Sequence, residues 1–184
     1  LTPMKGMLLT RFELNHCPIS NLTPLKGMPL TTLSFGDADV SDLTPLTGMP
    51  LKSLEFYENP VSDLTPLKGM LLTKLIFGQT DVTDLTPLKG MPLIELLLWG
   101  TTVSDLTPLK GMPLEKLAIA DTRVTDLTPL DGMQLREFGF VAKKFTGNVD
   151  VLRKMKTLTK VATDYHVDWP AAEFWKKYDA GEFK

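Results

Sequence analysis

The stretch Pro92-Leu-Ile-Glu-Leu-Leu-Leu-Trp-Gly-Thr-Thr-Val-Ser-Asp-Leu-Thr-Pro-Leu-Lys-Gly-Met112 is one complete repeat of this chain, and it decides the fold. The proline of its Leu-Thr-Pro string recurs every 21 residues, at Pro3, Pro24, Pro45, Pro66, Pro87, Pro108 and Pro129. A fixed period of this length indicates a solenoid, in which each unit buries its apolar side only against its neighbours. Because the repeat carries the architecture, we expect function in the residues that break it.

Each unit begins with a short apolar pattern. Counting from Leu9, six full 21-residue units cover residues 9–134, after a truncated half unit at residues 1–8. The units open Leu-x-x-[Leu/Phe]-x-[Leu/Phe/Ile], as in Leu30-Thr-Thr-Leu-Ser-Phe35. This alternation predicts a strand with positions 4 and 6 turned inward and positions 3, 5 and 7 turned outward. Units stacked in one direction then predict a parallel sheet.

The second half of each unit reads Asp-Leu-Thr-Pro-Leu-Lys-Gly-Met with few changes. Thr suits an N-cap, Pro a first helical position and Gly a stop, so we expect one short 3₁₀ turn on the outer side. The recurring Met has the same 21-residue period as the core residues, which favours a packing role over a row of thioether ligands for a soft metal ion. Hydrogen bonding to the loop backbone explains the recurring Asp better than calcium binding does. We therefore expect no metal site and no cofactor.

This repeat resembles the leucine-rich repeat family over roughly residues 1–163, and it looks closest to short bacterial repeats of the planctomycete type. The segment Pro170-Ala-Ala-Glu-Phe-Trp-Lys176 also looks like the terminal part of those proteins. The resemblance implies an α/β solenoid, a leucine-rich repeat horseshoe with a concave parallel β-sheet, short 3₁₀ turns on the convex side and a C-terminal helical cap. It further implies that the concave face binds proteins.

The last unit departs from the pattern. Residues 135–163 are expected to form a degenerate repeat and one extra strand at Leu158-x-x-Val161. Either Asn148 or Asp150 can cap a helix that runs through Lys156.

Residues 164–184 are expected to form a helical cap that starts at Asp168 and Pro170. A solenoid needs such a cap to keep its open end in solution. Three aromatic residues of this helix can cover the core: Phe174, Trp175 and Tyr178.

The outward positions 5 and 7 vary most between units, and large apolar residues gather there in the third to fifth units. Neutral drift at exposed positions can by itself explain this variation; the alternative is function, because exposed aromatic and aliphatic clusters are costly in a soluble monomer. Strands ~4.8 Å apart put the backbones of Tyr57 and Trp99 ~10 Å apart. Gly78 lies between them and is expected to leave an open slot for a partner's side chain. The candidate anchor comprises Tyr57, Ile76, Leu97 and Trp99.

Charge near this anchor is one-sided. Seven acidic residues stand at outward or strand-exit positions of the full units, against Arg123 alone: Glu13, Asp37, Asp39, Glu55, Glu58, Asp81 and Asp121. The sequence therefore predicts a partly acidic concave face. Carboxylates beside aromatic rings favour an Arg or Lys side chain of a partner, and they disfavour nucleic acid.

Composition excludes several other classes of function. The chain has 20 basic and 22 acidic residues, so it has no general attraction to nucleic acid or anionic membranes. No apolar run approaches the ~18 residues of a membrane helix. With two His, one Cys and no Gly-rich phosphate loop, the chain offers no candidate nucleophile or base, and we expect no enzymatic activity.

These observations predict a non-enzymatic module that binds a protein or peptide. Its site comprises the anchor with Gly78 and four nearby acidic residues: Glu55, Glu58, Asp37 and Asp121. The alternative is a structural or regulatory module that forms a homodimer or packs on another domain of a longer parent protein.

Overall fold

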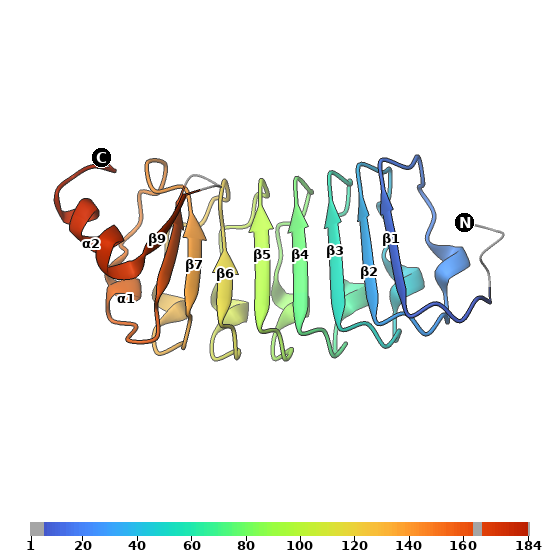
Figure 1. Ribbon diagram of the computed structural model, residues 1–184. Helices are drawn as coiled ribbons and strands as arrows, with labels where there is room; N and C mark the ends of the chain where they lie inside the picture. The colour runs from blue at the N-terminus through green and yellow to red at the C-terminus, as the bar shows by residue number, and fades with distance from the viewer. Residues whose placement is uncertain (1–5, 164–166, 184) are drawn as a thin grey trace.

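One open β-sheet runs the length of the molecule (Figure 1). The computed structural model describes residues 6–163 and 167–183, and within them the strands follow one another in chain order from β1 to β9. Their bounds are β1 Arg11–Asn15, β2 Thr32–Gly36, β3 Ser53–Tyr57, β4 Lys74–Gly78, β5 Glu95–Trp99, β6 Lys116–Ala118, β7 Glu137–Phe140, β8 Lys160–Thr163 and β9 Val167–Pro170. The half unit expected at residues 1–8 falls largely outside the described residues.

Strands β1 to β8 pair in parallel, as the repeat predicts. In the full repeats each residue lies beside its equivalent 21 residues further on, as Leu33 does beside Leu54. Strand β9, in contrast, pairs antiparallel with β8. The expectation of a helix starting at Asp168 is therefore wrong, because Asp168 lies within β9 and the backbone stays extended up to Pro170.

Short 3₁₀ turns lie behind the sheet, in agreement with the prediction (Figure 1). They are η2 Thr23–Leu25, η3 Thr44–Leu46, η4 Thr65–Leu67, η5 Thr86–Leu88, η6 Thr107–Leu109 and η7 Thr128–Leu130. Each has its Pro in the first turn, where the missing N–H costs nothing. The expectation of Thr at the N-cap is wrong, since Leu64 holds that place in η4 and makes no side-chain cap bond. The recurring Asp before it bonds to the turn instead: Asp63 Oδ1 accepts a hydrogen bond from the Thr65 N–H at 2.7 Å.

The core lies between the sheet and the turns. Positions 1, 4 and 6 of the strands and the Leu residues of the turns are buried, most of them completely. Three phenylalanines at position 6 stack on one another, with ring centroids 5.7 Å apart for Phe35 and Phe56 and 5.5 Å apart for Phe56 and Phe77. The repeated methionines from Met28 to Met133 are 2–6% exposed, which confirms their packing role.

The C-terminal end is closed by two helices, α1 Asp150–Arg153 and α2 Ala171–Asp179. Helix α1 is shorter than the helix expected through Lys156; Asn148 Oδ1 accepts a hydrogen bond from the Asp150 N–H at 2.7 Å. Phe174 of α2 is fully buried, as predicted, within a group of aromatic rings. Those rings belong to Phe140, Trp175, Tyr178 and Phe183.

The first coil is less well covered than the later ones. Phe12, Leu14 and Ile19 are only partly buried, whereas their equivalents in the second unit are fully buried. Strand β1 has a neighbour on one side only in the described part of the chain.

The phenylalanine stack gives a direct test of the core. Phe56→Ala removes the ring between two others and should lower the free energy of unfolding by about 3–5 kcal/mol. Phe56→Leu should cost less, because Leu98 holds the same position in β5. Chemical denaturation measures both losses; equal stability of the Ala variant and the parent protein would contradict this packing.

The recurring Asp that precedes most of the 3₁₀ turns predicts a specific response to acid. Hydrogen bonds from the Thr86 side chain and backbone lower the pKa of Asp84 below its usual 3.8, so its carboxylate form favours the folded state. The resulting stability is present above the unfolded pKa and is lost as the pH falls through the folded value. Asn21 makes the same bond to Thr23 without a charge, at 2.8 Å.

We therefore expect the triple variant D63N/D84N/D105N to melt near the parent protein's temperature at pH 7. Between pH 5 and pH 3 its melting temperature should fall less than that of the parent, as followed by circular dichroism. The variant D84A should melt lower at both ends of this range. Parallel acid profiles for the parent and the Asn variant would show that these carboxylates are not responsible.

Candidate binding face

The sheet presents one face to the core and the opposite face to solvent, and we call the second the strand face. It carries the side chains at positions 3, 5 and 7 of each unit, on the side away from the 3₁₀ turns (Figure 1). At position 5, Glu55 pairs with Ile76 and Ile76 with Leu97 across neighbouring strands. All four members of the predicted anchor lie on this face, each partly buried: Tyr57, Ile76, Leu97 and Trp99.

The slot expected at Gly78 is filled by the protein itself. A β-carbon added to Gly78 would collide with Cε2, Cδ2 and Nε1 of the Trp99 indole. Because three neighbouring ring atoms surround that point, the face of the indole covers the glycine. The expectation of an open slot between Tyr57 and Trp99 is therefore wrong: glycine leaves room, and the next strand's own tryptophan takes it.

Tyr57 lies in the same way on Gly36 of β2. A β-carbon at Gly36 would meet three atoms at the tip of the Tyr57 ring. The phenol O–H of Tyr57 donates a hydrogen bond to Asn15 Oδ1 at 2.8 Å, two strands away. This bond was not predicted, although position 7 alternates between glycine and an aromatic residue in a way that indicates the arrangement: Gly36, Tyr57, Gly78, Trp99.

The two rings shape this part of the strand face. Each reaches across to the preceding strand with one face on a glycine, and both side chains are partly exposed. Ile76 and Leu97 stand beside them at position 5 of adjacent strands. The strand face therefore carries an ordered apolar cluster over β2 to β5, formed by the two rings with Ile76 and Leu97.

Ion pairs neutralise the edge of this surface nearer the strand starts. Glu55 Oε1 lies 2.7 Å from Lys74 Nζ, and the hydrogen bond to Glu55 raises the pKa of Lys74. Lys116 lies between Glu95 and Glu137, at 3.5 and 3.4 Å. Glu55 thus contributes little net negative charge.

The acidic character is confined to the edge where the strands end. There Asp37 Oδ2 lies 3.0 Å from His16 Nδ1, and Lys144 Nζ lies 2.8 Å from Asp121 Oδ1. Lys144 was not anticipated, because it comes from the irregular last unit. Three acidic residues at this edge have no ion pair in the described part of the chain: Asp39, Glu58 and Asp81.

The backbone at this same edge is left-handed in six successive units. Position 8 has φ between 49° and 59° in each, and only one of these residues is glycine. They are His16, Asp37, Glu58, Gln79, Gly100 and Asp121. The N–H of the left-handed residue itself donates to the next coil, as when Glu58 N–H donates to the Gly78 carbonyl at 3.0 Å. A turn of fixed shape therefore holds Glu58 next to the aromatic surface.

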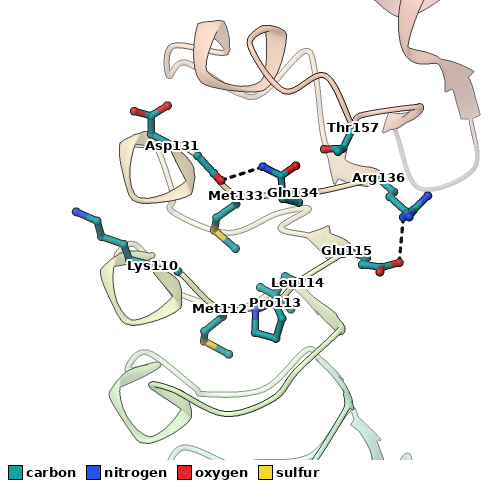
Figure 2. A pocket seen from close by; sticks show the side chains of 12 residues that line it. Lys110, Met112, Pro113, Leu114, Glu115, Asp131, Met133, Gln134, Arg136 and Thr157 are labelled. Carbon is teal, nitrogen blue, oxygen red and sulfur yellow. Dashed lines mark hydrogen bonds and ion pairs between the residues drawn. The ribbon is translucent and has the colours of Figure 1, made fainter.

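A hollow lies elsewhere, between the loops that lead into β6 and β7 (Figure 2). It encloses about 610 Å³, and its lining includes Met112, Pro113, Met133 and Gln134. Similar hollows occur between the earlier coils, lined by equivalent residues. This hollow is a product of coil stacking, and no predicted site residue lines it.

Other chemistry finds little support in the structure. Among residues 6–163 and 167–183, no group of three or more His, Cys, Asp or Glu side chains is placed to hold a metal ion. No helix among these residues is both long and apolar enough to cross a membrane. The recurring Asp residues instead stabilise the loops before the 3₁₀ turns, since each accepts a hydrogen bond from the N–H of the Thr two positions later.

Comparison with solved structures agrees with this architecture. An internalin (inlF) from Listeria monocytogenes superimposes with a TM-score of 0.77 over 89% of this chain, at 24% sequence identity. The structure is a leucine-rich repeat solenoid. A second internalin, C2 (inlC2) from the same organism, gives a TM-score of 0.58 at 25% identity, covering 72% of this chain and 71% of its own. This leucine-rich repeat chain spans 50% of the length of the first internalin.

No protein-family model and no curated protein matches the sequence. The likeness is therefore one of fold, and assignment to the planctomycete type stays a prediction. Leucine-rich repeat solenoids commonly mediate protein–protein interaction through their extended sheet surface.

The contact between Trp99 and Gly78 can be tested by a double-mutant cycle. Gly78→Ala places a methyl group where the indole lies, and overpacking of this kind costs about 1–3 kcal/mol. In a Trp99→Ala background the same change should cost much less, because the obstructing ring is gone. Chemical denaturation measures the cycle; an equal cost in both backgrounds would mean that the ring does not cover the glycine.

Proposed function

We propose that this solenoid is a non-enzymatic module that binds a protein or peptide through the strand face of β2 to β5. The observation that carries the proposal is the pair of aromatic rings held flat on glycines, with Ile76 and Leu97 beside them. Aromatic side chains supply large contact area and are enriched among residues that dominate binding energy. Two aromatic side chains, Tyr57 and Trp99, clustered with the aliphatic Ile76 and Leu97 on the strand face therefore make an anchor.

Pre-ordering strengthens this proposal. Binding costs free energy whenever a mobile side chain has to be fixed. The Tyr57 ring is already held between Gly36 and Asn15, and the Trp99 ring already rests on Gly78. A partner therefore meets a surface whose main contact groups need little further ordering.

The charges indicate the polarity of the partner. Glu58 has no ion pair within the described residues, and Asp37 has only His16 beside it. These carboxylates would attract a partner with exposed Arg or Lys and would repel nucleic acid. Glu55 and Asp121 belong to the same site as secondary contacts, because Lys74 and Lys144 already balance them.

The test compares captured partners between two single variants. Trp99→Ala should weaken binding by ~2 kcal/mol or more, about 30-fold in affinity. Ile94→Ser is the matched control, because this residue is 45% exposed outside the anchor. Affinity capture from the source cell with quantitative mass spectrometry identifies partners, and titration of each purified partner measures the loss.

Partners retained equally by the parent protein and a folded Trp99→Ala variant would contradict the site. The self-association alternative is resolved with the same variants by light scattering. A dimer that dissociates on Trp99→Asp would favour the homodimer over a foreign partner. A monomer at all concentrations would remove that alternative.

A further inference from the structure

We propose that the strand face recognises a proline-rich segment in the polyproline II conformation, flanked by a basic residue. This inference rests on the proposed function and names the class of partner. It follows from the spacing of the two rings, from their partial exposure, and from the charge between them.

The two rings lie on Gly36 and Gly78, which occupy the same position of β2 and β4 with one strand between them. Strands ~4.8 Å apart place the rings ~9.6 Å apart along the solenoid. A polyproline II helix rises ~3.1 Å per residue with three residues per turn, so equivalent side chains recur every ~9.3 Å on one face. The two repeats are of similar length.

Other extended or helical partners fit this spacing less well. Side chains on one face of a β-strand recur every ~6.7 Å and then at ~13 Å, so they cannot meet both rings in register. An α-helix repeats its face at ~5.4 Å per turn, and seven residues span ~10.5 Å. Of the three repeats, that of polyproline II lies nearest to the two-strand spacing of the glycines.

The chemistry of the rings favours proline as well. Each ring has one face on glycine and is partly exposed, and aromatic-lined surfaces are what proline-rich ligands dock on. A polyproline II segment has no internal hydrogen bonds, so its carbonyls are free to accept. The Trp99 indole N–H makes no hydrogen bond to the described part of the chain and can donate to such a carbonyl.

The acidic residues near the two rings favour a basic residue beside the prolines of the partner. Glu58 follows β3, the strand between the two ring positions, and its backbone φ of 52° fixes its direction. Asp39 and Asp81 stand at the same edge in the coils on either side. In the second to fourth units, positions 8 to 10 contain four acidic residues and no Lys or Arg. An Arg next to the prolines would find uncompensated carboxylates within one strand spacing.

The experiment uses a defined probe. A fluorescein-labelled peptide, Arg-Pro-Pro-Leu-Pro-Pro-Leu-Pro, is titrated with the whole chain in low salt, and binding is followed by fluorescence anisotropy. The control peptide has Ala in place of every Pro and keeps the same charge. We expect saturable binding of the proline peptide and at least tenfold weaker binding of the Ala peptide.

Protein variants assign the contacts. Tyr57→Ala and Trp99→Ala should each weaken binding of the proline peptide at least tenfold, and Ile94→Ser should leave it unchanged. Glu58→Gln should weaken binding several-fold in low salt, with the difference fading at high salt. Gln79 has nearly the same backbone conformation, with φ of 49°, so Gln is accepted at this position. Circular dichroism and melting curves confirm that each variant is folded.

The result that overturns this inference is distinct from failure of the proposed function. If a captured protein depends on Trp99 but the proline peptide does not bind, or binds no better than the Ala peptide, recognition of polyproline is wrong and the binding face stands. Peptide binding that survives Tyr57→Ala and Trp99→Ala equally overturns it. If neither the peptide nor any captured protein depends on Trp99, both proposals fail.

Discussion

In-register stacking of identical coils is the constraint on which the rest of the structure depends. Because the units from the second to the fifth match residue for residue, each side chain lies beside its own equivalent from the next coil. In the core this produces the stacked phenylalanines around Phe56 and the columns of buried Leu and Met. On the surface the same rule would place like charges together, and the alternation of Lys74, Glu95, Lys116 and Glu137 avoids that repulsion.

Stacking also explains how the strand face is built. An aromatic ring at position 7 stands beside the position 7 residue of the preceding coil. Where that residue is Gly36 or Gly78, the ring can lie flat across it. The site is therefore a property of pairs of coils, and no single repeat contains it. This is why the glycines matter as much as Tyr57 and Trp99 for the shape of the surface.

The sequence predicted most of the fold because its signals are local and repeated. The strands, the 3₁₀ turns and the bonding role of Asp63 all follow from motifs within one unit. The C-terminal end was predicted less well, because its sequence occurs once and no equivalent units can be compared. Strand β9 was missed and α1 is shorter than expected. On the strand face the residues were identified but their arrangement was not. The direction in which Trp99 leans, and the pairing of Glu55 with Lys74, depend on side-chain contacts between coils.

Ring faces resting on glycine are the central claim of this account of the strand face, and nuclear magnetic resonance observes them directly. A proton held above the face of an aromatic ring is shielded by the ring current. We predict that the α-protons of Gly36 and Gly78 resonate well upfield of those of Gly139, which has no aromatic ring among the atoms nearest to its added β-carbon. The shift at Gly78 should vanish in Trp99→Ala, and the shift at Gly36 in Tyr57→Ala. Ordinary chemical shifts for both glycines in the parent protein would contradict the account.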